Sequence, residues 1–282
     1  MKVHSRTTNP ISPRTAVRRL SWLAAALLVT LLPGCTSAPP VAEVTPIPAV
    51  TPPPALPVPP QPTLAERLAL AAPEVDPDVL ALAVQAQQCA TGSGTVAPVE
   101  RLAVIDYSRP STEPRLWVFA LDDARLLYVE HVAHGKHSGA NLATEFSNVE
   151  GSLQSSLGLF STAETYIGGH GYSLRMDGLE PGINDHARDR LIVIHGADYV
   201  DPAQALRQGR LGRSFGCPAV RSGIAREVID SLKGGQLLFA YYPDMHWLKG
   251  SRFLGCAGEG EPGGAIASVA SKPGQRLSRS SE

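Results

Sequence analysis

His195 and Cys217 are the two residues whose types and spacing could carry out chemistry. His195 directly follows the apolar run Arg190–Ile194, and Cys217 stands 22 residues later, at the end of Ser214–Cys217. Acyl transfer needs a nucleophile, a base and backbone amides that face the developing oxyanion. A free cysteine thiol has a pKa of about 8.5 and is mostly protonated at neutral pH, so it depends on a base. The pair therefore predicts a cysteine acyl-transfer site.

Each of these residues also has a structural interpretation, and the surrounding sequence distinguishes the two. Alone, a histidine at a strand end is commonly a satisfied structural residue, and a single cysteine commonly packs as a small hydrophobe. Here Val193–Gly196 and Ser214–Pro218 together resemble the active-site signature of L,D-transpeptidases (YkuD-type), a His-Gly followed by Ser-x-Gly-Cys. The resemblance is closest to the murein L,D-transpeptidases. It covers about Glu100 to Asp244, with support from Gly151–Phe160, His170–Leu174 and Ala240–Pro243.

This resemblance implies a role for each residue of the motif. Cys217 would be the nucleophile, His195 the general base and Ser214 the residue that supports the loop. The amides of Phe215, Gly216 and Cys217 would form the oxyanion hole. In this family a backbone carbonyl often steadies the histidine, so no acidic third member is expected. The resemblance implies no cofactor and no metal.

The chain departs from the commoner family pattern beside the cysteine. That pattern has a second histidine where Phe215 stands and an Arg or Asn where Ala219 stands. Arg213 or Arg221 could supply the missing positive charge for a peptide carboxylate. Four further residues could line a substrate groove, although they fit plain turn and surface positions equally well: His170, Tyr172, Arg175 and Asn184.

Other histidines offer competing patterns. His131, His134 and His137 have a spacing that invites a metal site. Residues three apart point to opposite faces of a strand, however, and no HExxH or paired CxxC accompanies them. His246 follows Cys217, an order that fits a different class of cysteine hydrolase, but it lies outside the apparent core. His195 is therefore preferred as the base.

The hydropathy pattern predicts a mainly β domain with small flanking helices, which agrees with the β-sandwich that the resemblance implies. Two helices are predicted where a capping residue precedes a periodic apolar run: Leu64–Ala71 after Thr63, and Asp78–Ala90 after Asp76. A third helix is predicted near the C-terminal end, over Ile224–Leu232. Alternating or continuous apolar runs predict five strands: 102–107, 115–119, 125–129, 190–194 and 236–242. The glycine-punctuated stretch Phe160–Tyr172 is expected to mix loop and short strand.

The N-terminal 35 residues are typical of a signal peptide. Arginines precede the apolar run Leu20–Leu32, which is shorter than the roughly 20 apolar residues that span a bilayer. The run ends at Gly34-Cys35, which resembles the bacterial lipobox, so Cys35 would become the lipidated N-terminus. The residue after the cysteine is Thr36. An Asp at this position would favour retention of the lipoprotein at the inner membrane, whereas Thr36 favours the outer membrane. We expect a periplasm-facing lipoprotein of the outer membrane; an ordinary cleaved signal is the alternative.

Composition divides the rest of the chain. Residues 36–62 form a proline-rich linker that favours extended polyproline II, and 63–97 form a helical segment before the domain. The catalytic domain is expected over 98–256, and the Gly-, Ser- and charge-rich segment 257–282 is expected to be a disordered tail. The net charge is −1, and no Lys or Arg run occurs in the body of the chain. A nucleic-acid partner is therefore not expected.

The cysteine count agrees with this division. The chain has four cysteines. If Cys35 carries lipid and Cys217 stays free, Cys89 and Cys256 remain, one on either side of the catalytic region. In an oxidising envelope they could form a disulfide, although two buried thiols would look the same in the sequence. The sequence does not indicate an oligomeric state.

The expected function is cysteine-dependent transpeptidation of peptidoglycan stem peptides. An acyl-enzyme on Cys217 would pass its acyl group to an amine on a neighbouring stem. If water took the acyl group, the same site would act as a carboxypeptidase or hydrolase. A third interpretation is a lipoprotein that binds peptidoglycan without turning it over.

Overall fold

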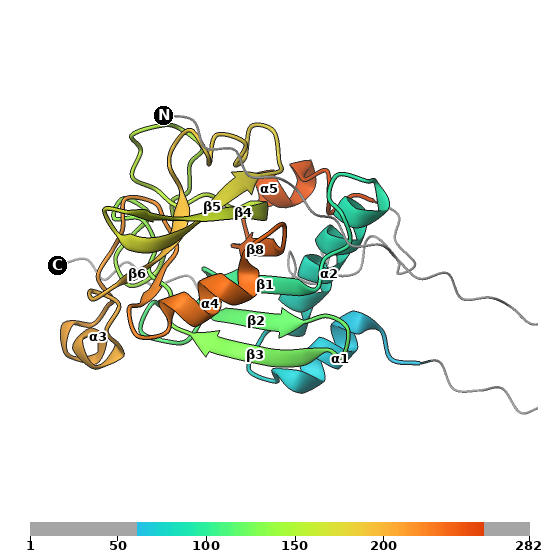
Figure 1. Cartoon of the computed structure of the whole chain (residues 1–282), viewed down its shortest axis with the longest axis horizontal. Coiled ribbons are helices and arrows are strands. Elements are labelled where there is room, and N and C mark those ends of the chain that lie inside the picture. The colour runs from blue at the N-terminus through green and yellow to red at the C-terminus, as the bar shows by residue number, and fades with distance from the viewer. Residues whose placement is uncertain (1–60, 257–282) are drawn as a thin grey trace, which may run out of the picture. The chain divides into compact units, whose positions relative to one another are not determined.

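The computed structural model describes residues 61–256, which hold eight strands and five helices (Figure 1). In chain order the elements are α1 (Leu64–Ala71), α2 (Pro77–Gly92), β1 (Arg101–Asp106), β2 (Leu116–Ala120), β3 (Arg125–Glu130), β4 (Gly158–Gly168), β5 (Gly171–Gly178), β6 (Val193–Ala197), α3 (Pro202–Gln208), β7 (Ala219–Arg221), α4 (Ala225–Leu232), β8 (Leu237–Tyr241) and α5 (Met245–Gly250).

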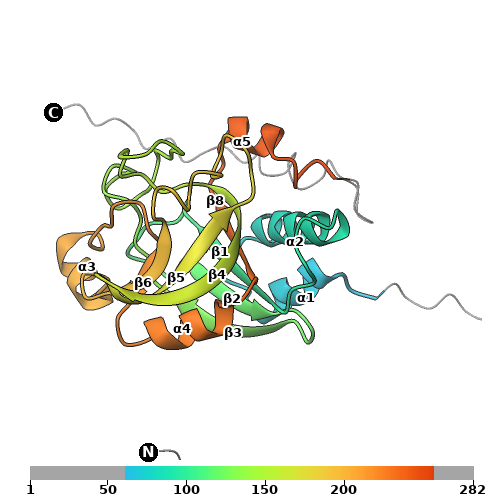
Figure 2. The same cartoon turned by 45° about the horizontal axis from the view of Figure 1, so that its top comes forward.

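A single eight-stranded sheet forms the framework, in the order β3-β2-β1-β8-β4-β5-β6-β7. The pairs β1–β8 and β6–β7 are parallel, and the other pairs are antiparallel. Figure 2 shows β4 as a long curved strand. Ala133, which follows β3, bridges to Ala219 of β7, so the two ends of the sheet meet and the sheet is nearly closed. The prediction of a mainly β domain with small flanking helices is confirmed.

The two N-terminal helices begin where their capping residues predict. Thr63 and Glu66 form a capping box: the Thr63 hydroxyl accepts from the Glu66 N–H at 3.2 Å, and the Glu66 carboxylate accepts from the Thr63 N–H at 2.7 Å. Asp76 caps α2 through its bond from the Asp78 N–H at 3.0 Å. Leu68 and Leu82 are fully buried in the same hydrophobic cluster as the strands. Segment 63–97 therefore packs into the core of the domain.

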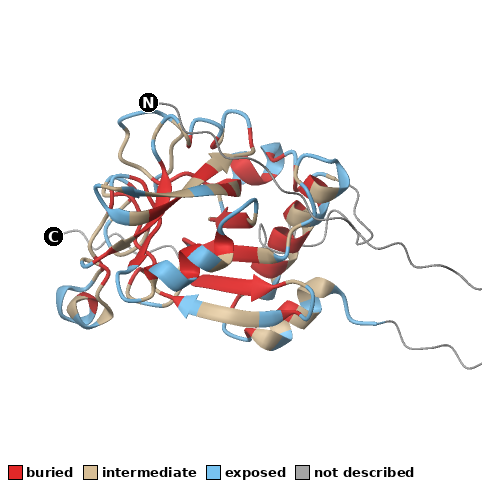
Figure 3. Cartoon of the chain, viewed as in Figure 1, coloured by how far each residue is buried: buried red, intermediate tan, exposed pale blue. Residues whose placement is uncertain are grey.

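The central strands are the most deeply buried part of the sheet. Every residue of β2 and β8 is buried, as the red strands in Figure 3 show. Helix α2 packs on β1 and β8, and α4 packs on β1, β5 and β6. This burial explains why β8 and the end of β1 read as continuous apolar runs without alternation. The core fixes the strands whose ends carry the site.

The glycine-punctuated stretch differs from its prediction. It forms a long antiparallel hairpin of β4 and β5, and the turn between them contains His170. The register shifts between Thr162 and Thr165, and such a bulge breaks the two-residue alternation by which a strand is recognised. Because the outer half of the hairpin is also only partly buried, its apolar signal is weak. The hairpin brings His170 to His195, and the two rings stack.

β6 begins later than the apolar run predicts. The backbone turns at Leu191, which has a φ of 55° and is 65% exposed, and the strand starts at Val193. A left-handed φ is unfavourable for a leucine, and it ends any extended run from Arg190. His195 consequently lies within the strand, where it pairs with Ser173 of β5 and Ala219 of β7.

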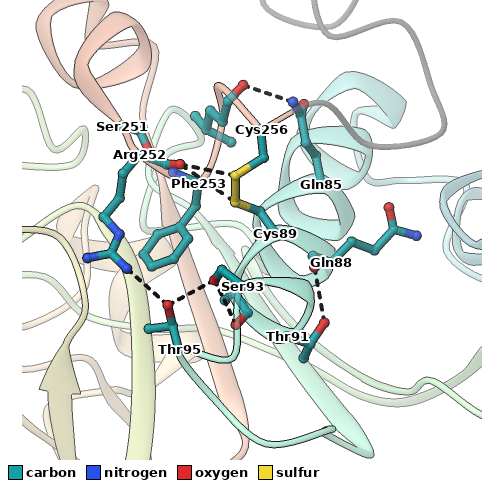
Figure 4. The surroundings of a disulfide bond; sticks show 12 residues. Gln85, Gln88, Cys89, Thr91, Ser93, Thr95, Ser251, Arg252, Phe253 and Cys256 are labelled. Carbon is teal, nitrogen blue, oxygen red and sulfur yellow. Dashed lines mark hydrogen bonds between the residues drawn. A yellow bond between two sulfur atoms is a disulfide. The ribbon is translucent and has the colours of Figure 1, made fainter.

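The two remaining cysteines form a disulfide in the structure. Cys89 on α2 is bonded to Cys256, which follows α5, and 167 residues separate them. Figure 4 shows the same two segments joined by hydrogen bonds: Gln85 donates to the Leu254 carbonyl at 2.8 Å, and Arg252 donates to the Thr95 hydroxyl at 2.9 Å. The bond ties the first long helix to the last described segment.

Removal of this disulfide should destabilise the domain. The variant Cys89→Ser/Cys256→Ser is expected to lose about 2–4 kcal/mol of unfolding free energy, because the cross-link restricts the unfolded chain over a long loop. Urea denaturation followed by circular dichroism measures the loss. Wild-type protein treated with dithiothreitol should match the variant. Equal denaturation midpoints for the variant and the untreated wild type would contradict the prediction.

Several predictions concern other parts of the chain. The signal peptide (1–35) with its lipidated Cys35, nearly all of the linker (36–62) and the tail (257–282) lie outside the described residues. Within 61–256, no helix combines the length and the apolar character needed to cross a bilayer.

Candidate active site

Cys217 lies where β6 and β7 run in parallel. Their register pairs His195 with Ala219, and Cys217 stands two residues before β7 begins. The Val193 N–H points to the Cys217 sulfur, and the thiol donates to the Leu191 carbonyl with an Sγ–O distance of 3.6 Å. The thiol thus lies beside β6 at Val193, and His195 follows two residues later on the same strand.

The His195 ring is oriented by its own strand. Nδ1 lies 2.9 Å from the Gly196 carbonyl, so a neutral imidazole donates Nδ1–H there and keeps Nε2 free as a base. This is the backbone carbonyl that the resemblance implies. Burial lowers the pKa of His195, the Gly196 carbonyl raises it, and His170 lowers it again; the net change is downward from 6.5. His195 is therefore neutral at neutral pH.

Burial also determines the protonation state of the nucleophile. Only 8% of Cys217 is exposed, and this burial raises the pKa of its thiol. The Val193 N–H, the positive charge of Arg190 and the N–H of Cys217 itself lower that pKa without offsetting burial. Since the imidazole is neutral as well, the resting site holds a thiol and a free base.

Ser214 holds the nucleophile loop in its shape. Its hydroxyl donates to the Cys217 carbonyl at 2.6 Å and accepts from the Gly216 N–H at 3.0 Å, which fits the supporting role expected for it. The hydrogen bond from the Gly216 N–H to Ser214 changes the set of amides expected to form the oxyanion hole. The Gly216 N–H is already engaged, so the amides of Phe215 and Cys217 are the remaining donors from that set. Phe215 itself is 66% exposed, beside the buried thiol.

Gly216 has a different function in the loop. Its φ is +131°, and a Cβ there would lie 2.8 Å from the Gln154 carbonyl oxygen, so only glycine fits the conformation and the space. Its carbonyl accepts from the Ser155 hydroxyl at 3.0 Å. The loop around Gln154 and Ser155 therefore packs directly against the nucleophile loop.

Of the expected substrate residues, His170 lies at the site. Its ring stacks on that of His195, with 4.4 Å between centroids and an interplanar angle of 22°. His170 is itself exposed, whereas His195 is 1% exposed. The hairpin turn thus places one imidazole over the other and covers the ring of His195.

The structure engages the other expected substrate residues elsewhere. Tyr172 donates to Asp230 on α4 at 2.7 Å. Arg221 makes a two-point ion pair with the buried carboxylate of Glu130, at 2.6 and 2.8 Å, so its charge is already compensated. Arg213 donates to the carbonyls of Lys136 and Gly139.

Two further expected groove residues also have structural partners. Asn184 is fully buried and donates to the carbonyls of Leu157 and Leu159, which corrects its expected place in a groove. Arg175 forms an ion pair with Glu164 at 3.0 Å.

The competing histidines have separate partners. His131 contacts the Thr112 carbonyl, and His137 contacts the Ser152 carbonyl. His134 is buried, with Nδ1 2.7 Å from Arg115; burial and then the Arg115 charge lower its pKa to about 3. No cluster of three metal-ligating side chains occurs in 61–256. His246 is exposed on α5, where it lines a pocket with Phe146 and Trp247 that does not include Cys217.

Sequence reasoning missed Arg190 as a residue of the site. It was assigned to the start of a strand, whereas its guanidinium lies beside the nucleophile loop. A charged side chain at the head of a buried apolar run was the available signal, because such a charge needs specific partners.

Comparisons with known proteins found one family model and several solved structures that are similar to this chain. The model of the L,D-transpeptidase catalytic domain matches residues 71–241, more than half of the chain. An L,D-transpeptidase structure from Mycobacterium smegmatis is similar at 16% identity and a TM-score of 0.32, over 51% of this chain and 59% of that one. One from Mycobacterium tuberculosis has 13% identity and a TM-score of 0.33, over 51% and 58%. One from Xylanimonas cellulosilytica has 16% identity and a TM-score of 0.30, over 62% and 93%.

The chain spans about three fifths of the mycobacterial chains. No curated protein sequence matches it. The family match includes β1 to β8 with both His195 and Cys217. The chain therefore belongs to the L,D-transpeptidase catalytic domain family.

Proposed function

We propose that this protein is a cysteine-dependent L,D-transpeptidase that acts on peptidoglycan stem peptides. One observation supports this above the others: the Cys217 thiol contacts the Val193 N–H of the strand that holds His195 with Nε2 free. A thiol and an oriented neutral base in a water-poor setting are what cysteine acyl transfer requires.

The first half of the reaction forms a thioester. Nε2 of His195 takes the thiol proton as the sulfur attacks the carbonyl carbon of the third residue of a stem tetrapeptide. The amides of Phe215 and Cys217 face the oxyanion that develops. His195 then returns the proton to the amine of the terminal D-amino acid as the C–N bond breaks. The products of this step are the thioester and a free D-amino acid.

The second half transfers the acyl group. A side-chain amine of a neighbouring stem gives a proton to His195 and attacks the thioester carbonyl. The C–S bond breaks, the thiolate regains the proton, and a new amide joins the two third residues. Water in place of the amine would give the trimmed stem of a carboxypeptidase. The two outcomes differ in which acceptor reaches the thioester.

The proposal includes a location at the cell envelope, with a lipid anchor on Cys35 facing the periplasm. The run Leu20–Leu32 before Gly34-Cys35 supports it. The Cys89–Cys256 disulfide is consistent with an oxidising compartment. Labelling of cells with a palmitate analogue tests the anchor, and a Cys35→Ala protein that stayed labelled would contradict it.

Acylation by a carbapenem tests the nucleophile. We expect mass spectrometry to find one covalent adduct, on Cys217, because a strained β-lactam carbonyl is attacked like the peptide carbonyl. Incubation of the enzyme with muropeptides should yield cross-linked dimers. Trimmed monomers alone would assign the protein as a carboxypeptidase. Folded protein without any adduct would favour the non-catalytic, peptidoglycan-binding interpretation.

A further inference from the structure

Arg190 is a half-buried cation whose hydrogen-bond partners are all neutral. Its guanidinium donates to the carbonyls of Ser147 and Gln154 and to the hydroxyls of Ser152 and Ser156. Among the residues that the structure describes, no carboxylate forms an ion pair with it. A guanidinium that is bound but not neutralised keeps its full charge, and partial burial limits screening by solvent.

This charge lies directly behind the nucleophile. Arg190 donates to the Gln154 carbonyl at 2.7 Å, and that same oxygen lies 2.8 Å from where a Cβ on Gly216 would be. From the other side, the carbonyl of Leu191, the residue next to Arg190, accepts from the Cys217 thiol. These two contacts place the Arg190 guanidinium against the backbone of Gly216 and Cys217.

The other described titratable groups that interact electrostatically with the thiol are the phenols of Tyr107 and Tyr199, which are uncharged at neutral pH. Burial raises the pKa of Tyr107 and of Tyr199 to about 12 in each case, and His195 is neutral for the reason given above. Among the described groups that act electrostatically on Cys217, Arg190 is therefore the one that is charged at neutral pH, and it lowers the thiol pKa. The attraction is mutual, since the thiolate raises the pKa of Arg190.

We infer that Arg190 is a positioning residue whose positive charge stabilises the Cys217 thiolate, in addition to anchoring the 147–156 loop behind it. The inference rests on the proposed function, in which Cys217 is the nucleophile. It assigns to Arg190 the positive charge that the commoner family pattern carries two residues after the cysteine, where this chain has Ala219. The charge of Arg221 is compensated by Glu130, and Arg213 is not among the charges that act on the thiol.

The test separates the charge of Arg190 from its hydrogen bonds. The rate of Cys217 alkylation by iodoacetamide, measured against pH, gives the thiol pKa and needs no turnover. Arg190→Gln should raise that pKa by about one unit and slow alkylation at pH 7 by up to about tenfold. Arg190→Lys keeps the charge and should titrate like the wild type. At high pH the rates of all three proteins should converge, which a damaged site would not show.

Arg188→Gln is the matched control. Arg188 lies two residues earlier and forms ion pairs with Asp177 and Glu164, so its loss should leave the thiol pKa unchanged. A wild-type thiol pKa in Arg190→Gln, or an equal shift in Arg190→Lys, would overturn the inference. Should Arg190→Gln fail to fold, Arg190→Met replaces it as the neutral variant. If neither folds, the thiol pKa of Arg190→Lys decides: a wild-type value supports the charge, and a raised value rejects it.

These results are distinct from failure of the proposed function. An unreactive substrate or carbapenem would refute transpeptidation while the alkylation profile could still show the Arg190 effect. A normal adduct on Cys217 with no pKa shift in Arg190→Gln would leave the proposed function intact and reject only the role of Arg190.

Discussion

Replacement of Cys217 by alanine is expected to reduce cross-linking of muropeptides by at least about 10⁴-fold, because no other group can form the thioester. Carbapenem acylation should disappear with it. Quantification of products by liquid chromatography with mass spectrometry measures the first effect, and intact-protein mass measures the second.

The control for this variant is its stability. Alanine at position 217 removes one sulfur from a site without touching the loop bonds of Ser214, so the urea midpoint should stay close to that of the wild type. Cys217→Ser, which keeps a hydroxyl of higher pKa, should be nearly as inactive. Cross-linking that survived in folded Cys217→Ala would rule out the cysteine mechanism.

His195→Gln is expected to lower the rate of acylation by about 10²–10⁴-fold, the range typical of a lost general base. The pH profile gives the more specific evidence. Burial lowers the pKa of His195 below 6.5, so the wild-type rate should hold in mildly acidic buffer and fall only when the imidazole becomes protonated. The variant should lose this acidic limb, and its rate should rise with pH as the thiol ionises unaided.

His246→Gln provides the matched control for the base. His246 is exposed on α5 and would be the base if the Cys-then-His order applied. We expect its replacement to leave both the rate and the pH profile unchanged. If His246→Gln were the inactive variant and His195→Gln the active one, the assignment of the base to His195 would be wrong.

The sequence predicts the local elements well and the long-range partners poorly. Helix α1 begins where predicted because the Thr63 cap is a local signal, and His195 and Cys217 belong to short motifs. The β4–β5 hairpin was not predicted, since a bulge and partial exposure weaken its alternation. The ion pair of Arg221 with Glu130 joins residues 91 apart in the chain, so no local pattern announces it.

The oxyanion hole shows a second limit of the same kind. The motif places three amides near the thiol, yet the hydroxyl of Ser214 occupies one of them. Which amide remains free depends on a rotamer and on the left-handed φ of Gly216. Neither can be read from residue types alone, although the glycine signals that the backbone is unusual there.

The near closure of the sheet bears on how the protein behaves among other polypeptides. A sheet edge with free backbone groups can recruit strands from neighbouring molecules and begin aggregation. Here β7 is only three residues long, β3 lies against α1, and the Ala133–Ala219 bridge joins the two ends. The fold thus leaves only short stretches of edge at which a strand of another molecule could pair.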